Sequence, residues 1–299
     1  MHGIVVLDKA LGGSSNRALQ QVKRLYDANK AGHTGALDPL ATGVLPLCLG
    51  EATKVSQFLL DSDKAYRARI KLGVRTDTAD SEGEVIATAE AGSVTEAQIK
   101  KALIGFEGDI EQVPPMYSAL KRDGQPLYKL AREGKTVERE PRAITVYSIE
   151  LTDFDPQAQE VEIEVDCSKG TYIRTIADDL GQILGCGGHI IALRRLKAGA
   201  FTLADSQSFE ALEAEMQAGG FAAIDAKLMP MDKAIDALPA VHLPAYTAQF
   251  LKQGQAVQVS KPPADGLLRL YEDEEFIGIG VIDDDGKVAP KRLIVKDAS

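Results

Sequence analysis

The chain has 299 residues, 44% of them hydrophobic, and a formal net charge of −10 at pH 7. This length allows two domains, or one large domain with an appendage. No apolar run approaches membrane-spanning length, no signal peptide opens the chain, and the three cysteines lack Cys-x-x-Cys spacing. We therefore expect no membrane association, disulfide framework or zinc site, and we predict a reducing, cytoplasmic location.

The charge is unevenly distributed along the chain. Residues 1–75 hold eleven Lys and Arg against six Asp and Glu, whereas the remainder holds 23 against 38. Residues 148–166 alone carry seven acidic residues and no basic one. A basic face backed by an acidic body would steer RNA to one side of the molecule. The simpler alternative is that these Lys and Arg residues only solvate surface helices.

The first quarter of the chain predicts two strands and two helices. Residues 4–7 form a short apolar run typical of a buried strand, and Ser14 or Ser15 is suited to cap a following helix. Residues 55–59 indicate a second helix. Residues 66–72 alternate apolar or aromatic with basic side chains, which predicts a strand with one basic face. Such a face would suit RNA if it were exposed.

The middle of the chain predicts a helix, a long insertion, a strand and another helix. Ser93 and Glu96 have capping-box spacing before an apolar periodic segment. Residues 113–142 are rich in Pro, Gly and charge, and we interpret them as a partly irregular insertion. Residues 160–166 alternate acidic and β-branched side chains, which predicts a strand. Residues 173–184 have the periodicity of an amphipathic helix.

The last third predicts a domain boundary. Residues 203–236 are alanine-rich and predict helix, and a Pro-containing link follows them. We therefore expect one domain over residues 1–238 and a second, small all-β module over 239–299. Within that module, the run of Asp and Gly at 283–286 is typical of a hairpin turn.

One loop, residues 32–43, stands out chemically. It reads G-H-T-G-A-L-D-P-L-A-T-G and holds a single carboxylate, Asp38, among glycines and a proline. One carboxylate on a shaped turn suits a reaction that needs one nucleophile or base and no cofactor. An Asp-Pro pair in a Gly-rich run is also an ordinary turn, and the residues alone leave both interpretations open.

This loop resembles the signature of the bacterial TruB family, the tRNA pseudouridine-55 synthases. The similarity continues in order along the chain: V-L-D-K at 6–9, K-A-Y-R at 64–67, Q-V-P-P-M-Y-S-A-L-K at 112–121 and C-S-K-G-T-Y-I-R-T at 167–175. Segments 276–280 and 288–290 resemble the PUA-like RNA-binding domain of that family. Ala10 departs from the family pattern, which has proline there.

The resemblance implies a fold and an activity. The fold would be α+β, with a mixed, largely antiparallel sheet, flanking helices and a small C-terminal β-rich PUA-like domain. The activity would be isomerisation of uridine-55 in the tRNA T-loop to pseudouridine, with the base flipped out of its stack. No cofactor or metal is expected, because the reaction gains and loses no atoms. The route is left open: attack on the base, attack on the sugar, or removal of a sugar proton.

The resemblance also assigns roles to individual residues. Asp38 would be catalytic and Arg174 its cationic partner, since a desolvated carboxylate favours its neutral form without one. The substrate-binding residues would be His33, Tyr66, Tyr172, Leu193 and Lys9. From the residues alone, Arg174 could be a surface arginine, the tyrosines and leucine ordinary core, and His33 a turn residue. For Lys9, a phosphate contact and simple support of the site are equally open.

The expected partner is tRNA, through its T-arm, with no obligate protein partner and a monomeric state. Three alternatives remain: a non-catalytic RNA chaperone using the same surface, a guide-RNA-dependent dyskerin-type synthase, and an unrelated hydrolase that uses Asp38.

Overall fold

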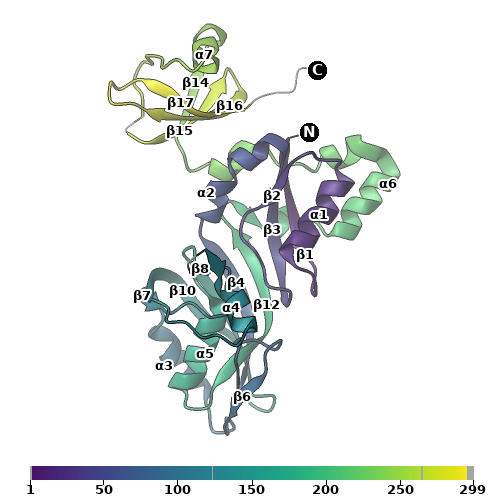
Figure 1. The fold of residues 1–299 in the computed structure, drawn as a ribbon, viewed down its shortest axis with the longest axis vertical. Helices are drawn as coiled ribbons and strands as arrows, with labels where there is room; N and C mark the ends of the chain where they lie inside the picture. Colours follow the sequence, from purple (N-terminus) through teal and green to yellow (C-terminus); the bar gives the residue numbers. More distant parts are fainter. Residues whose placement is uncertain (1, 123, 264, 295–299) are drawn as a thin grey trace.

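The computed structural model describes residues 2–122, 124–263 and 265–294 (Figure 1). Its main body is a nine-stranded mixed sheet in the order β1-β3-β12-β4-β11-β10-β7, with β2 beside β3 and β13 beside β12. The strands are β1 (Gly3–Lys9), β2 (Ala31–His33), β3 (Ala41–Leu49), β4 (Lys64–Leu72), β7 (Gly108–Gln112), β10 (Arg142–Asp155), β11 (Glu160–Cys167), β12 (Gly188–Ala198) and β13 (Phe201–Thr202). The β3–β12 pairing is parallel and the others in this sheet are antiparallel. The predicted α+β fold is confirmed.

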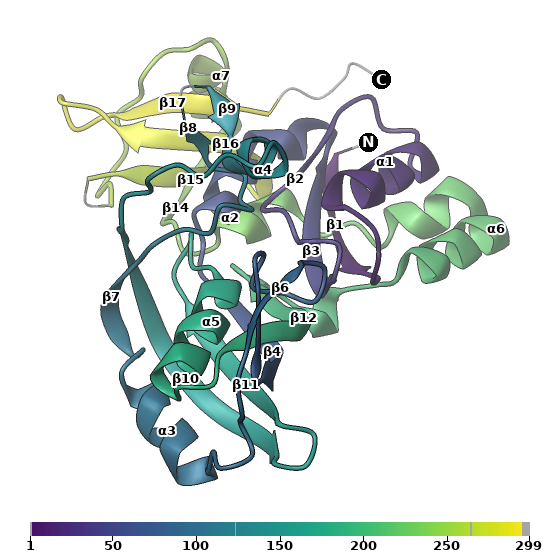
Figure 2. The same ribbon diagram turned by 60° about the horizontal axis from the view of Figure 1, so that its bottom comes forward.

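Helices flank this sheet at both ends (Figure 2). The helices are α1 (Ser15–Leu25), α2 (Ser56–Leu60), α3 (Glu96–Ile104), α5 (Ile173–Ile183) and α6 (Phe209–Asp225), with short 3-10 turns at Gly50–Lys54, Leu203–Asp205 and Met231–Ile235. Ser14 caps α1 as predicted, because its side chain accepts a hydrogen bond from the backbone N–H of Arg17. The expected cap of α3 was wrong: Thr95 and Gln98 form the capping box, two residues later than predicted.

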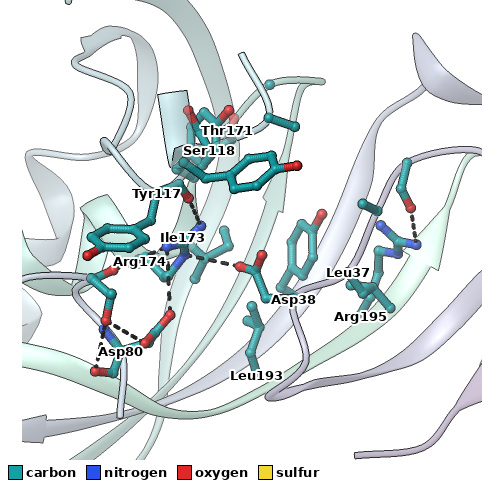
Figure 3. A pocket seen from close by; sticks show the side chains of 18 of the residues that line it. Leu37, Asp38, Asp80, Tyr117, Ser118, Thr171, Ile173, Arg174, Leu193 and Arg195 are labelled. Carbon is teal, nitrogen blue, oxygen red and sulfur yellow. Dashed lines mark hydrogen bonds and ion pairs between the residues drawn. The ribbon is translucent and has the colours of Figure 1, made fainter. Parts of the chain in front are cut away.

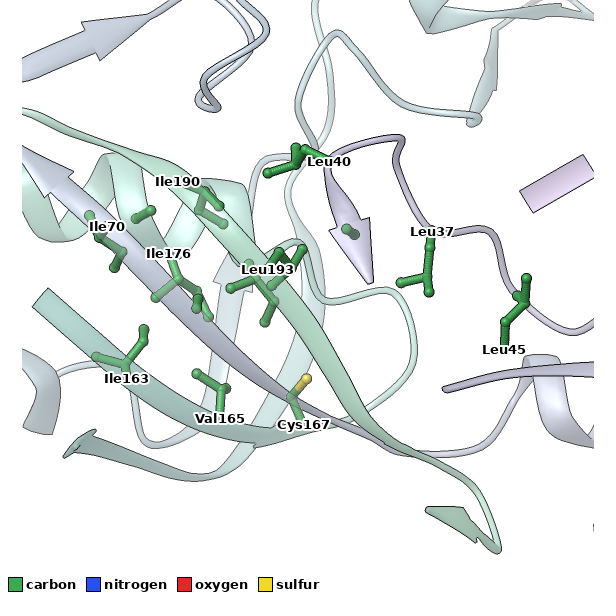
Figure 4. Close-up of a cluster of buried hydrophobic side chains, with 14 of the residues drawn as sticks. Leu37, Leu40, Leu45, Ile70, Ile163, Val165, Cys167, Ile176, Ile190 and Leu193 are labelled. Carbon is green, nitrogen blue, oxygen red and sulfur yellow. The ribbon is translucent and has the colours of Figure 1, made fainter. Parts of the chain in front are cut away.

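Strands β1 and β11 of the sheet are buried differently, and this difference accounts for their sequence patterns. In β1, Val5 and Leu7 belong to one hydrophobic cluster and Ile4 and Val6 to another, so this strand is covered on both faces. A strand buried on both faces gives a continuous apolar run. In β11 only alternate residues are buried, which gives the acidic and apolar alternation seen in the sequence. Figure 4 shows part of the larger cluster, where side chains from β4, β11, β12 and α5 pack together.

The basic face predicted for β4 exists, but carboxylates of the neighbouring strand cover it. Arg67 donates two hydrogen bonds to Glu164, at 2.9 and 2.6 Å. Arg69 lies 3.2 Å from Glu162 and 3.6 Å from Glu160. The antiparallel register places these residues opposite each other on one face of the sheet. This face is therefore neutralised within the protein.

The predicted insertion at 113–142 contains some regular secondary structure. It contains a two-stranded ribbon, β8 (Lys121–Arg122) with β9 (Gln125–Pro126), and a short helix α4 (Leu127–Arg132). Asp123 of this insertion lies outside the described residues. A second ribbon, β5 (Val74–Thr76) with β6 (Val85–Thr88), lies earlier in the chain.

The C-terminal part forms a second sheet in the order β14-β15-β16-β17. Its strands are β14 (Ala240–Leu243), β15 (Leu267–Glu272), β16 (Glu275–Ile282) and β17 (Val288–Leu293). The hairpin turn predicted at 283–286 joins β16 to β17. The all-β expectation was wrong in one respect, because α7 (Ala245–Lys252) follows Pro244 and packs its apolar face on this sheet. This part contacts the main body through Lys54, whose Nζ donates to the carbonyl of Leu293 at 2.7 Å.

Gly43 allows the parallel strands β3 and β12 to approach closely. Its φ is +99°, and a Cβ there would lie 2.2 Å from the carbonyl oxygen of Arg195. We expect Gly43→Ala to lower the free energy of unfolding by at least about 2 kcal/mol, since it adds backbone strain to a clash. Urea denaturation measures this. In the control, Gly32→Ala, the new Cβ has no heavy atom within 4 Å. Equal losses in the two variants would contradict the argument.

Candidate functional site

A pocket of about 500 Å³ opens where the Asp38 loop meets the middle of the sheet (Figure 3). Five segments line it: the loop at 35–39, the start of β4, the turn at 78–82, the insertion and the junction of β11 with α5. Leu60 of α2 and two residues of β12, Leu193 and Arg195, complete the wall. Segments that are far apart in sequence therefore meet around one carboxylate.

Asp38 and Arg174 form an ion pair in this pocket. The Nε of Arg174 lies 3.1 Å from Oδ2 of Asp38. The side chain of Asp38 is 42% exposed, toward the pocket, whereas that of Arg174 is only 6% exposed. The carboxylate therefore presents an open face to an incoming molecule while a buried cation holds its other side.

Arg174 is held from three further directions. Its Nη1 donates to the carbonyl of Thr78 at 3.2 Å and lies 3.6 Å from the carboxylate of Asp80. Its Nη2 donates to the carbonyl of Tyr117 at 2.8 Å. Asp80 is 3% exposed and accepts from the Thr78 hydroxyl at 2.6 Å. A guanidinium fixed by so many acceptors has one orientation, which directs Nε at Asp38.

The pKa of Asp38 is raised above its ordinary value, chiefly because burial removes solvent from the carboxylate. The charge of Arg174 acts in the opposite direction and favours the ionised form, while Asp80 raises the pKa further. Arg174 is thus the principal group that keeps Asp38 ionised in a partly dry pocket.

The backbone of the Asp38 loop is fixed by residues from the start of the chain. The Ser15 hydroxyl accepts from the N–H of Leu37 at 2.7 Å and donates to its carbonyl at 3.1 Å. Lys9 donates to the carbonyl of Ala41 at 2.7 Å, with those of Asp38 and Pro39 at 3.4 Å. The start of the chain therefore supports the backbone of the loop that carries Asp38.

Of the residues expected to bind substrate, Tyr66, Tyr172 and Leu193 line the pocket. Lys9 does not: it is 2% exposed and its ammonium group lies under the loop, so it supports the backbone and is too buried to meet a phosphate. His33 also lies outside the lining. It is half-buried in β2, its Nδ1 has no hydrogen-bond partner, and burial lowers its pKa.

The position of Tyr172 is set by the side chain of Gln112 at the end of β7. The Gln112 amide accepts from the N–H of Tyr172 at 2.8 Å and donates to its carbonyl at 3.1 Å. Tyr172 is the N-cap residue of α5, and no side chain of its own segment satisfies that helix end. The buried Gln112 therefore fixes both the helix start and the tyrosine beside Asp38.

Sequence reasoning missed several residues of this pocket, including Asp80, Tyr117 and Arg195. Asp80 follows Thr-Asp-Thr-Ala in a turn, and an acidic residue in a turn does not by itself indicate a functional site. Tyr117 belongs to the segment 112–121 that resembles the family, but the resemblance gave it no role of its own. Arg195 lies two residues after Leu193, yet nothing in the sequence distinguishes it from Arg194. In the structure, Arg194 pairs with Asp8 at 2.7 Å.

No described helix is both long enough and apolar enough to cross a membrane.

Comparison with protein families gives three consecutive matches. A model described as "TruB family pseudouridylate synthase (N terminal domain)" matches residues 23–173. One described as "tRNA pseudouridylate synthase B C-terminal domain" matches residues 174–236. A third, "Pseudouridine synthase II TruB, C-terminal", matches residues 239–294.

Curated relatives and solved structures agree with these matches. The chain is 53% identical to "tRNA pseudouridine synthase B" of Tolumonas auensis, over 98% of this chain and 92% of the relative. It is 54% identical to the protein of the same name from Yersinia enterocolitica, over 99% and 92%. A solved structure titled "Crystal Structure of a Cbf5-Nop10-Gar1 Complex" contains a chain with 26% identity and a TM-score of 0.75, covering 97% of this chain and 84% of that one.

Proposed function

The chain belongs to the TruB family of pseudouridylate synthases, and we propose that it isomerises uridine-55 in the T-loop of tRNA to pseudouridine. As a family member it is an isomerase. The tRNA substrate is proposed because relatives of 53–54% identity over nearly the whole chain are named for it. The observation that carries the catalytic assignment is the ion pair of Asp38 with the buried Arg174 in an open pocket.

The proposed chemistry begins at Asp38. The reaction breaks the bond from C1′ to N1, turns the uracil and joins C1′ to C5, after which C5 loses its proton and N1 gains one. Attack on the base, attack on the sugar and proton removal from the sugar all need an ionised carboxylate that faces the substrate. Arg174 supplies the compensating charge, and the walls of the pocket limit access of water.

The proposed base-binding residues are Tyr66, Tyr172 and Leu193. A flipped uracil has two apolar faces, so an aromatic ring stacks well on one and an aliphatic side chain covers the other. Lys9 serves the reaction indirectly, by holding the loop that carries Asp38. His33, near the base of the same loop, is proposed to contact the RNA from which the base has been flipped.

The proposed organisation is a catalytic domain over 1–238 and a PUA-like RNA-binding domain over 239–299, of which 264 and 295–299 lie outside the described residues. We propose that the protein acts as a monomer in the cytoplasm, without an obligate protein partner.

Tritium release from unmodified tRNA transcripts made with 5-tritiated uridine tests the proposed function. Isomerisation frees the hydrogen at C5, so the protein alone is expected to release one tritium per tRNA. A transcript with cytidine at position 55 is the control and should release none. Release that required an added guide RNA would favour the dyskerin-type alternative, and tRNA refolding without release would favour the chaperone.

The insertion at 113–142 is predicted to close on the RNA. Tyr117, Tyr128 and Arg132 of this segment line the pocket, and it is mildly basic, so it lies where a T-arm would enter. We expect its amides to exchange readily in the free protein and to gain protection with tRNA, while β11 stays protected in both states. Deleting its tip should weaken tRNA binding and leave the Asp38 pocket intact. Strong protection that does not change with tRNA would show a rigid structural element.

The basic residues of β4 are predicted not to bind tRNA, because Glu160, Glu162 and Glu164 neutralise them. Arg67→Ala and Arg69→Ala should each change the dissociation constant for tRNA by less than about twofold. Exposed side chains that are already paired with carboxylates contribute little further binding energy. Arg132→Ala, at the pocket, is the comparison and should weaken binding more. Filter binding at one fixed salt concentration measures all three. A larger loss with the β4 variants would place RNA on the opposite face of the sheet.

A further inference from the structure

Arg195 is a buried cation of the pocket that lacks an acidic partner. It is 1% exposed and lines the pocket wall on β12. Its neighbour Arg194 pairs with Asp8 at 2.7 Å, and Arg174 pairs with Asp38 at 3.1 Å. Within the described part of the chain, no carboxylate oxygen lies within 4.0 Å of the Arg195 guanidinium. A buried charge without a charged partner is costly, and a negative charge on a bound molecule would relieve that cost.

The hydrogen bonds of Arg195 fix it between the Asp38 loop and β3. Its Nε donates to the carbonyl of Val44 at 2.7 Å, and its Nη2 donates to that of Gly35 at 3.1 Å. In the view of Figure 3, Asp38 lies between Arg174 and Arg195. Backbone carbonyls orient the guanidinium but carry only partial charges, so its positive charge is not cancelled.

Neighbouring groups respond to this charge. Lys64, which also lines the pocket, is 7% exposed, and its ammonium group donates to the carbonyls of Leu59, Leu60 and Ser62. Burial and then the charge of Arg195 lower the pKa of Lys64 to about 8. Arg195 likewise acts to lower the pKa of Tyr66, against a larger rise caused by burial. The Arg195 side of the pocket therefore carries a positive charge without a carboxylate partner, whereas the charge of Asp38 is compensated by Arg174.

We propose that Arg195 stabilises the negative charge that develops on the uracil ring when its bond to the sugar breaks. This inference rests on the proposed function. When the bond from C1′ to N1 breaks, its electron pair stays with N1, so the ring carries the charge until C1′ bonds to C5. If Asp38 instead adds to the base, the ring becomes an enolate and is again anionic. In each route a fixed cation beside the ring acts as an oxyanion hole does.

A backbone phosphate is a less suitable counter-charge for Arg195. Phosphates of a flipped nucleotide remain with the strand outside the base pocket, and exposed basic residues meet them there. A side chain that is 1% exposed and lines the pocket from β12 can be reached only by a group that enters the pocket. The uracil ring is the part of the substrate that enters.

Chemical rescue of Arg195→Ala tests the proposal. We expect the single-turnover rate on a T-arm RNA to fall by about 10²–10³-fold, as on removal of one oxyanion-hole donor, with RNA affinity within about threefold of wild type. Guanidinium chloride, far below unfolding concentrations, should restore part of the rate. Urea has a similar shape and also donates hydrogen bonds but is neutral, and it should restore little. Sodium chloride at equal ionic strength controls for salt.

Other outcomes would overturn the proposal. Equal rescue by urea would show that Arg195 only positions the loop. A loss of RNA affinity as large as the loss of rate would show a phosphate contact. The matched control, Arg194→Ala, removes the same charge from the adjacent position and should keep at least about a third of the wild-type rate.

A second pair of variants covers the case in which Arg195→Ala does not fold. Arg195→Lys keeps the charge and Arg195→Gln removes it, so Lys should retain a rate at least tenfold above Gln. Equal rates would contradict a role for charge. All rates are ratios to active wild-type protein, so an inactive wild type would refute the proposed function and not the assignment of Arg195.

Discussion

Replacing Asp38 with Asn is expected to abolish isomerisation and leave tRNA affinity nearly unchanged. The amide has the shape of the carboxylate but is neither a nucleophile nor a base, so the rate should fall by at least about 10⁴-fold. Affinity should persist because phosphate contacts dominate RNA binding and Asp38 contributes none. Tritium release and filter binding on the same preparation measure the two quantities. Asp153→Asn, on the distant end of β10 with a 61% exposed side chain, is the matched control.

We also expect the pocket of the Asp38→Asn variant to keep its structure. Arg174 would lose the negative charge of Asp38 but keep Asp80 and the carbonyls of Thr78 and Tyr117. The pocket should therefore keep its shape, and a thermal unfolding curve close to wild type would show this. More than a few per cent of wild-type activity in a protein free of contaminating enzyme would refute the assignment of Asp38.

Replacing Arg174 is also predicted to have a large effect on the rate. Arg174→Lys keeps a charge but cannot reach Asp38, Asp80 and two carbonyls from one ammonium group, so we expect a fall in rate of about 10²–10³-fold. Tritium release under single-turnover conditions measures it. Arg75→Lys is the control. Arg75 donates two hydrogen bonds to the carboxylate of Asp178, at 2.7 and 2.9 Å, and it lies outside the pocket lining. A near-normal rate in Arg174→Lys would show that the ion pair is not needed.

The pH dependence of Arg174→Met supplies an independent test of the same pair. Burial raises the pKa of Asp38 and Arg174 opposes that rise, so removing the cation should raise the pKa further. The ionised carboxylate is the reactive form, and activity is lost as pH falls through this pKa. The acidic limb of the rate profile should therefore move to higher pH in Arg174→Met. A limb at the same pH would contradict the proposed coupling.

The sequence predicted the parts of the site that lie on continuous segments. The loop of Asp38, the strand of Tyr66 and the start of the helix that carries Arg174 follow from local pattern or from a recognised motif. Their meeting does not, since it depends on the parallel pairing of β3 with β12, which Gly43 permits through close backbone contact. Pairing across a sheet between distant segments leaves no trace in local periodicity.

The features that the sequence did not predict correctly have physical causes of the same kind. The basic face of β4 looked suited to RNA because its acidic partners, on β11, are about 95 positions away in sequence. The importance of Asp80 and Arg195 follows only from their contacts. Asp80 lies beside the Arg174 guanidinium, and Arg195 donates to two backbone carbonyls. Helix α7 was missed because short, Pro-bounded segments carry little periodic signal.

The most direct test of the central claim is to locate the product in the RNA. An unmodified tRNA transcript is incubated with the protein alone, and pseudouridine is mapped along it by chemical derivatisation and mass spectrometry. A single pseudouridine at position 55, formed by wild-type protein and absent with Asp38→Asn, is the predicted result. Pseudouridine at other positions, none at all, or an equal yield from the Asn variant would contradict the account.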